Sequence, residues 1–118
     1  MTIELFYFDG CPNHEALLAH LHELVNEVEP APDVVLRRIA DDAAAQRERF
    51  LGSPTVRVGG RDIEPGADAR DDYGMKCRLF ATSTGLSGLP ADEWLLAALA
   101  ASRREGEEEV VGADRDRS

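Results

Sequence analysis

The residues of this chain best suited to chemistry are its two cysteines, Cys11 and Cys77. Cys11 stands in the run Asp9-Gly10-Cys11-Pro12, between a strand-like segment and a helix-like segment. A thiol at the start of a helix faces unpaired backbone N–H groups and the positive end of the helix dipole. Both lower its pKa and favour the nucleophilic thiolate. The pattern therefore predicts that Cys11 is a nucleophile.

His14 and Ser53-Pro54 are the next candidates for a site around Cys11. His14 lies on the sheet-facing side of the same helix, near its start, where a cation or hydrogen-bond donor would hold Cys11 as the thiolate. A packed or solvated first-turn histidine would have no such role, and the sequence leaves both interpretations open. Gly52-Ser53-Pro54-Thr55 precedes a strand, where Ser-Pro alone usually marks a turn.

Cys77 is the candidate second thiol. A glycine turn between the third and fourth strands would return the chain to the end of the sheet that holds Cys11. Lys76 and Arg78 flank Cys77 and would favour its thiolate, although a lone cysteine is often only a small buried residue. Whether the two cysteines come close enough to pair stays open, because the loop over residues 65–89 is long.

The same loop carries Asp71, Asp72 and Tyr73. Long loops in compact domains are usually functional or mobile, so this one is a candidate lid, and Tyr73 is a candidate substrate contact. Asp71-Asp72 would equally suit a solvated turn. Asp9 is a possible proton donor or acceptor near Cys11, but Asp before Gly is above all a turn former.

The elements that must position these residues follow the order strand, helix, strand, helix, strand, strand, helix. Alternating and helical apolar patterns distinguish them, and Gly52 is expected to close the second helix. We expect strands at Ile3–Phe8, Val34–Ile39, Thr55–Val58 and Arg61–Glu64, a glycine turn at Gly59-Gly60, and helices with apolar faces over Leu17–Val28, over Ala43–Leu51 and from Leu89 onward. The pattern predicts an α/β domain.

The whole chain of 118 residues is long enough for one domain, which we place at residues 1–102, before a charged tail at 103–118 that we expect to be disordered. A net charge of −10 argues against nucleic acid and anionic membrane surfaces as partners. No leader or membrane span is expected, so we predict a soluble, cytoplasmic protein. Two distant cysteines lack zinc-site spacing, and we expect neither a metal nor a cofactor.

This arrangement resembles the thioredoxin-like fold over residues 2–101. The resemblance implies a four-stranded mixed sheet in the order 2-1-3-4, flanked by helices, with the nucleophilic cysteine capping the first helix. It also implies that Ser53-Pro54 is a cis bond beside Cys11. Ser53, Pro54 and Thr55 would then contact substrate, with the Ser53 carbonyl and the Thr55 N–H pairing with an extended thiol substrate.

Three sequence runs are also similar to a group of short bacterial thioredoxin-family proteins, some of which are labelled alkylmercury lyase-like. The runs are Phe-Asp-Gly-Cys-Pro-Asn, Gly-Ser-Pro-Thr-Val and Tyr-Gly-Met-Lys-Cys-Arg. Some members of that group carry selenocysteine where Cys11 stands, which implies a redox position. The chain departs from the thioredoxin pattern because Cys11-Pro12-Asn13-His14 lacks the second cysteine of a Cys-x-x-Cys pair.

Three functional hypotheses remain open at this point. The first is a thiol–disulfide oxidoreductase or reductase acting on a small thiol, a small disulfide or a protein disulfide, with Cys11 as nucleophile and Cys77 or an external thiol as resolving group. The second is soft-metal or organomercurial handling by two thiolates, with Asp9 or Asp72 supplying a proton. The third is a binding module without thiol chemistry. The sequence does not indicate an oligomeric state.

Overall fold

The computed structural model describes residues 2–10, 13–28 and 31–102. Cys11, Pro12 and the tail at 103–118 therefore lie outside the described residues. The structure confirms the predicted alternation of elements. In chain order they are β1 (Thr2–Tyr7), α1 (Asn13–Val25), β2 (Asp33–Arg38), α2 (Asp42–Arg47), β3 (Thr55–Val58), β4 (Arg61–Asp62), the 3-10 helix η1 (Ala67–Ala69), β5 (Phe80–Thr82) and β6 (Gly85–Ser87). A further helix covers residues 92–102.

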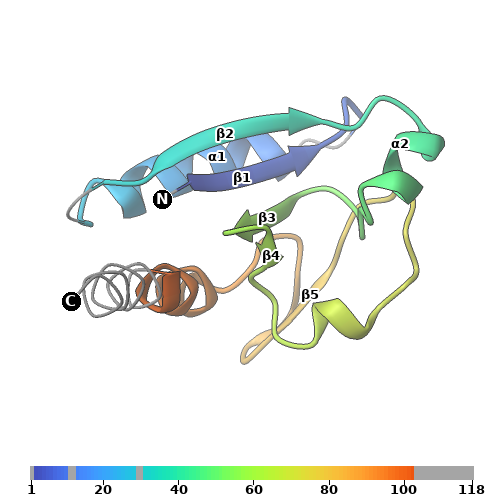
Figure 1. The fold of residues 1–118 in the computed structure, drawn as a ribbon. Coiled ribbons are helices and arrows are strands. Elements are labelled where there is room, and N and C mark those ends of the chain that lie inside the picture. Colours follow the sequence, from blue (N-terminus) through green and yellow to red (C-terminus); the bar gives the residue numbers. More distant parts are fainter. Residues whose placement is uncertain (1, 11–12, 29–30, 103–118) are drawn as a thin grey trace, which may run out of the picture.

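Four of the strands form one mixed sheet in the order β2-β1-β3-β4, the order that the resemblance implied. β1 pairs in parallel with β2 and antiparallel with β3, and β3 pairs antiparallel with β4. Gly59 and Gly60 form the turn between β3 and β4 with φ values of 62° and 81°, a region that favours glycine. Figure 1 shows the sheet with α1 behind it.

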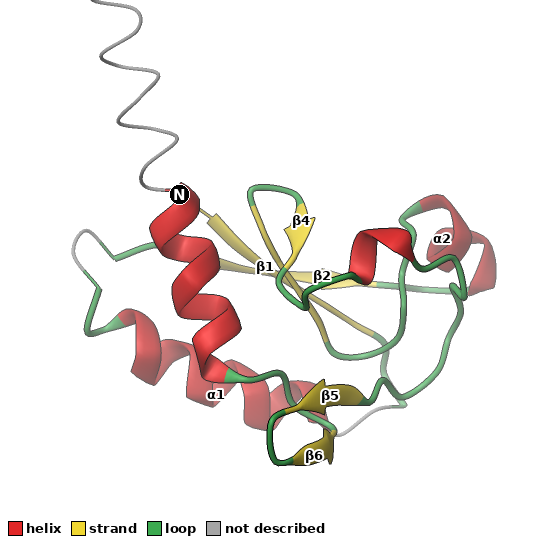
Figure 2. Ribbon diagram, turned by 90° about the horizontal axis from the view of Figure 1, so that it is seen from below, coloured by secondary structure: helices red, strands yellow, loops and turns green. Residues whose placement is uncertain are grey.

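The main core lies between one sheet face and two helices, α1 and the helix at residues 92–102 (Figure 2). Apolar side chains one helical turn apart on α1 pack on alternate residues of β1 and β3, so each element contributes the face that its periodicity predicts. The buried members of this core are Ile3, Leu5, Leu17, Leu21, Val25, Val56, Val58, Ile63, Leu95 and Leu99. Its packing holds the start of α1 against the end of β1.

A smaller core lies on the opposite sheet face, under α2, and contains Phe6, Ile39, Ala44, Ala45 and Phe50. The carboxylate of Asp41 caps α2 by accepting a hydrogen bond from the Ala44 N–H at 2.8 Å.

The prediction that α2 runs to Leu51 and closes at Gly52 was wrong. The helix ends at Arg47, and Arg49 takes the left-handed conformation with φ 57°. The Phe50 N–H then donates to the Ala45 carbonyl at 2.8 Å, which brings Phe50 back under the helix. The burial of Phe50 in the smaller core therefore decides where the helix ends.

The segment at residues 65–89, expected to be a structureless loop, contains two ordered pieces. η1 follows β4, and β5 and β6 form an antiparallel hairpin in which Ala81 pairs with Leu86. Among the described residues, no helix combines the length and apolar character that a membrane span requires.

Candidate functional site

A short parallel β-bridge joins Ser53 to Cys77 and forms the centre of the candidate site. The Ser53 N–H donates to the Lys76 carbonyl at 2.8 Å, and the Ser53 carbonyl accepts from the Arg78 N–H at 2.9 Å. The Ser53-Pro54 peptide bond is cis, as the resemblance implied. Cys77 is exposed and therefore lies at the surface, next to the loop that leads into β3.

Hydrogen bonds join residues 73–78, which include Cys77, to residues 46–53. The Gln46 side chain donates to the Tyr73 carbonyl at 3.0 Å, and the Gly74 N–H donates to the Phe50 carbonyl at 2.9 Å. Together with the two bonds at Ser53, these contacts tie residues 73–78 to the chain between α2 and β3. This part of the long loop is therefore bonded to the body of the domain.

Gly52 permits residues 76–78 to approach Ser53 closely. Its φ is 127°, and a Cβ atom at this position would lie 2.9 Å from the Lys76 carbonyl oxygen and 3.0 Å from the Cβ of Arg78. Real Cβ contacts are rarely so short, so any other residue at position 52 would push residues 76–78 away from Ser53.

Arg78 anchors the segment from inside. Its side chain is 0% exposed, and its guanidinium donates to Asp62 at 2.6 and 3.1 Å, to Glu64 at 2.9 Å and to the Thr55 hydroxyl at 3.0 Å. The guanidinium also lies 4.5 Å from the centre of the Phe80 ring. A buried arginine requires such partners, because an unpaired charge is costly to bury.

Arg78 and Lys76 do not form the cationic flank that we expected on both sides of the Cys77 thiol. In an extended segment successive side chains point to opposite sides, and here Arg78 points into the domain toward Asp62 and Glu64. Lys76 pairs with Asp72 at 2.8 Å. Both charges are therefore compensated by carboxylates.

The N-terminal end of α1 lies on another side of the site. Its first residue, Asn13, contacts Gly88, where an added Cβ would lie 2.5 Å from the Asn13 side-chain nitrogen. This contact sets the end of the β5–β6 hairpin against the start of α1 (Figure 2). His14 stacks on Tyr7 with ring centroids 4.3 Å apart and an interplanar angle of 18°. His14 therefore faces the sheet, as predicted.

Ser53, Pro54 and Thr55, the predicted substrate contacts, are all buried. The Thr55 hydroxyl donates to the Gly52 carbonyl at 2.6 Å. The Ser53 carbonyl, which we expected to face a substrate, accepts its hydrogen bond from Arg78 instead. These residues thus support the Cys77 segment, and the chain itself takes the place expected for an extended substrate.

The two acids considered as proton donors are both ion-paired. Arg38 donates to both carboxylate oxygens of Asp9, with contacts between 2.6 and 3.0 Å, and this hydrogen bonding lowers the pKa of Asp9. Hydrogen bonds from Arg70 and then from Lys76 hold the pKa of Asp72 far below its ordinary value. Both groups are carboxylates at neutral pH, so neither is ready to donate a proton.

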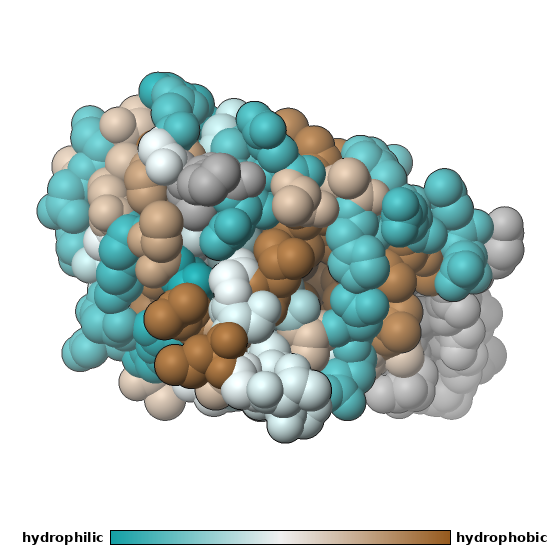
Figure 3. Space-filling model, turned by 180° about the vertical axis from the view of Figure 1, so that it is seen from behind, coloured by the Kyte–Doolittle hydropathy of each residue, from teal (hydrophilic) through white to brown (hydrophobic). Residues whose placement is uncertain are grey.

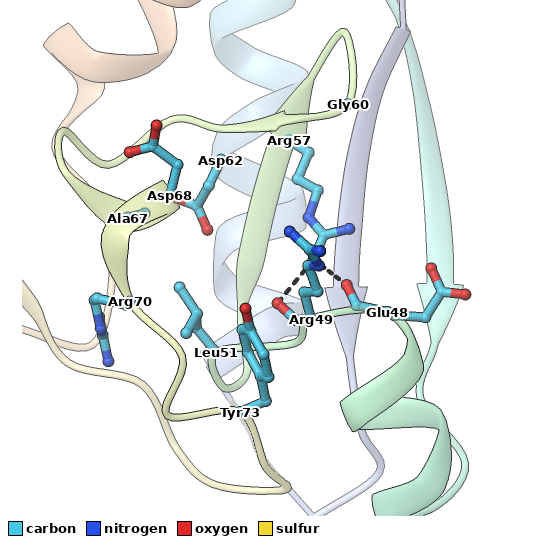
Figure 4. A pocket seen from close by; sticks show the side chains of 10 residues that line it. All are labelled: Glu48, Arg49, Leu51, Arg57, Gly60, Asp62, Ala67, Asp68, Arg70 and Tyr73. Atoms are coloured by element: carbon cyan, nitrogen blue, oxygen red, sulfur yellow. Dashed lines mark hydrogen bonds between the residues drawn. The ribbon is translucent and has the colours of Figure 1, made fainter.

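Tyr73 lines a pocket of about 190 Å³ (Figure 4). Leu51, Arg57 and Arg70 are among the residues that line it. In the view of Figure 4, α1 lies behind β3, the strand that carries Arg57. The Arg57 guanidinium donates to the backbone carbonyls of Glu48 and Arg49, at 2.6 and 3.1 Å. The residues that line this pocket do not include Ser53 or Cys77. The structure thus gives Tyr73 a different environment from that of Cys77.

Leu79 and Leu86 are the most exposed large apolar side chains of the described residues, at 59% and 72%. Leu79 is two residues beyond Cys77, and Leu86 belongs to the hairpin that follows. Apolar side chains interrupt the polar surface on the face viewed in Figure 3. Over the described ranges, His, Cys, Asp and Glu side chains form no group of three or more that would hold a metal ion.

Sequence reasoning missed Gly52 and the carboxylates around Arg78. Asp62 and Glu64 are separated by the buried Ile63, an alternation that places both acids on one side of an extended chain. Two carboxylates placed together beside a core require a cation, and this was the signal that could have identified Arg78 as a buried residue. Gly52 was interpreted only as the end of the second helix, and its contact with residues 76–78 had no local signal.

No protein-family model matches this chain, and no curated protein or solved structure is similar enough to count as a relative.

Proposed function

We propose that this chain is a thiol-dependent redox protein with a thioredoxin-like domain, in which Cys11 is the nucleophile and Cys77 is the resolving thiol. The observation that carries the proposal is the β-bridge between Ser53 and Cys77. It fixes an exposed cysteine beside Pro54, the residue that the thioredoxin resemblance places next to the nucleophile. The sheet order, with Pro54 immediately before β3, further supports the thioredoxin-like assignment.

The proposed reaction is a pair of thiol–disulfide exchanges. The Cys11 thiolate attacks one sulfur of a substrate disulfide, and the other substrate sulfur leaves as a thiolate. The Cys77 thiolate then attacks the Cys11 sulfur of this mixed disulfide and releases the second substrate thiolate. Two cysteines are oxidised to one disulfide, and the substrate disulfide is reduced to two thiols. An external thiol would regenerate the protein by the reverse exchange.

The described acids favour thiol exchange over cleavage of a carbon–mercury bond. Cleavage requires a proton for the leaving carbon, and disulfide exchange does not. Asp9 and Asp72 are both held as carboxylates by neighbouring cations. The charge state of these two acids therefore favours the redox hypothesis over the organomercurial one.

Single-cysteine variants test the proposal, because the chain has only two cysteines. With a small disulfide under single-turnover conditions, we expect Cys77→Ser to stop at a mixed disulfide on Cys11, and the wild type to release both substrate thiols. Iodoacetamide should alkylate Cys11 faster than Cys77 at neutral pH, when read by mass spectrometry. A Cys11→Ser variant that reacts as fast as the wild type would refute the assignment and favour a binding module.

A further inference from the structure

The geometry points to low-molecular-weight disulfides, and not extended polypeptides, as the substrates of this site, because residues 76–78 already occupy the strand position beside Ser53. This inference rests on the proposed function and specifies its substrate class. It concerns the first exchange, in which a thiolate of this chain forms a mixed disulfide and one substrate thiolate leaves.

An extended peptide binds a strand edge mainly through backbone N–H and carbonyl groups. At Ser53 both groups are already bonded, to Lys76 at 2.8 Å and to Arg78 at 2.9 Å. Three residues earlier, the Phe50 carbonyl accepts from the Gly74 N–H at 2.9 Å. The edge from Phe50 to Ser53 is therefore paired with the chain's own segment, and a substrate peptide would have to displace that segment.

Two features oppose such displacement. Residues 76–78 lie so close to Gly52 that even a Cβ there would clash with the Lys76 carbonyl. The side chain of Arg78 is 0% exposed and ends in the carboxylates of Asp62 and Glu64. Lifting the segment would break these charge-assisted hydrogen bonds as well as the backbone pairing. Residues 76–78 are thus held in place beside Ser53.

A small molecule does not need the strand edge. Cys77 is exposed, so its surroundings are open to solvent on at least one side. The hairpin formed by β5 and β6 closes toward α1 through the contact between Gly88 and Asn13. A compact disulfide can therefore approach from the solvent side, whereas a peptide that continues in both directions would meet residues 76–78.

The test compares two probes with the same reacting group. One is the symmetric disulfide of N-acetylcysteine methylamide, and the other is the symmetric disulfide of an unstructured peptide with the same cysteine at its centre. Rates of mixed-disulfide formation are measured in Cys77→Ser, so that only the attack by Cys11 is followed. Each rate is then divided by the rate at which dithiothreitol reduces the same probe, which corrects for the intrinsic reactivity of its disulfide. We expect the small probe to react about tenfold faster or more, because a peptide chain can pair with Ser53 only by breaking the two hydrogen bonds that residues 76–78 make there.

Gly52→Ala in the same background should bring the ratio of the two rates toward one, because its Cβ forces residues 76–78 off Ser53. Gly59→Ala is the matched control, since Gly59 also has a positive φ, of 62°, but has nothing within 4 Å of an added Cβ. That variant should keep the ratio of the parent. If Gly52→Ala does not fold, slow hydrogen exchange at the Ser53 and Arg78 amides of the parent is expected instead, and fast exchange would overturn the inference.

The outcomes separate the two proposals. Equal normalised rates for the two probes would overturn the substrate inference and leave the proposed function standing. Failure of both probes to react with Cys11 would overturn the proposed function itself. A ratio that favours the small probe and collapses only in Gly52→Ala supports both.

Discussion

Replacing Arg78 with methionine should destabilise the domain strongly. Methionine keeps much of the unbranched apolar stem but removes the guanidinium, which makes four hydrogen bonds to Thr55, Asp62 and Glu64. The two carboxylates are only 12% and 11% exposed, so they are left partly buried without a cation. Breaking a buried ion pair from one side costs about 3–5 kcal/mol, and we expect a loss of free energy of unfolding in that range.

Urea unfolding followed by the fluorescence of Trp94 measures this loss. Trp94 is the single tryptophan of the chain, and its ring centroid lies 6.2 Å from that of Phe80, the ring that Arg78 contacts. Arg47→Met is the matched control, because Arg47 is exposed at the end of α2, and its replacement should change the free energy by about 0.5 kcal/mol or less.

Combining Arg78→Met with Asp62→Asn should recover part of the loss, since it removes one of the carboxylates left without a cation. A loss below about 1 kcal/mol for Arg78→Met alone would refute the view that the buried guanidinium anchors the Cys77 segment.

Three further predictions concern Gly52, Asp72 and Leu17. Gly52→Ala should speed hydrogen exchange at the Ser53 N–H, because a Cβ at 2.9 Å displaces the Lys76 carbonyl that accepts from it; unchanged exchange would contradict the packing argument. Asp72→Asn should lower the urea midpoint at pH 7, because the hydrogen bond from Arg70 lowers the pKa of Asp72 and so stabilises the folded state with the carboxylate ionised. The difference in midpoint between variant and wild type should shrink below about pH 4, where the unfolded carboxyl becomes protonated, and a difference that grows at low pH would contradict this reasoning. Leu17→Ala should cost about 2–5 kcal/mol of unfolding free energy in the same assay, because Leu17 is 2% exposed in the main core, and a loss under about 1 kcal/mol would contradict that burial.

Strand β1 and helix α1 could be predicted from the sequence because their apolar patterns agree with their burial, whereas the order of the strands was implied only by the resemblance. Ile3 and Leu5 alternate on β1, and Leu17, Leu21 and Val25 recur at helical spacing on α1, and all five are buried. In these two elements the apolar residues of the local pattern are also the buried residues, so periodicity alone was sufficient to predict the element and its buried face.

The Cys77 segment could not be predicted in the same way because its burial is the reverse of its hydropathy. Arg78 is buried and Leu79 is 59% exposed, although a charged residue and a leucine suggest the opposite. The burial of Arg78 depends on Asp62 and Glu64, which lie 16 and 14 residues earlier in the chain. Such a pairing is a tertiary contact that no local window contains.

The end of α2 was missed for a similar reason. Gly52 suggested a helix stop, but its positive φ serves the approach of residues 76–78, and Arg49 takes the left-handed position instead. The same glycine signal thus fits a helix cap and a close backbone contact, and only the position of the distant segment distinguishes them.

Whether Cys11 and Cys77 act as one redox pair can be read from the intact mass of the protein after reaction with one equivalent of a small disulfide. We expect a product lighter than the reduced protein by two hydrogens, with no bound substrate thiol, and a mixed disulfide as the only product in Cys77→Ser. A wild-type protein that retains one substrate thiol on Cys11 and never forms the internal disulfide would contradict it.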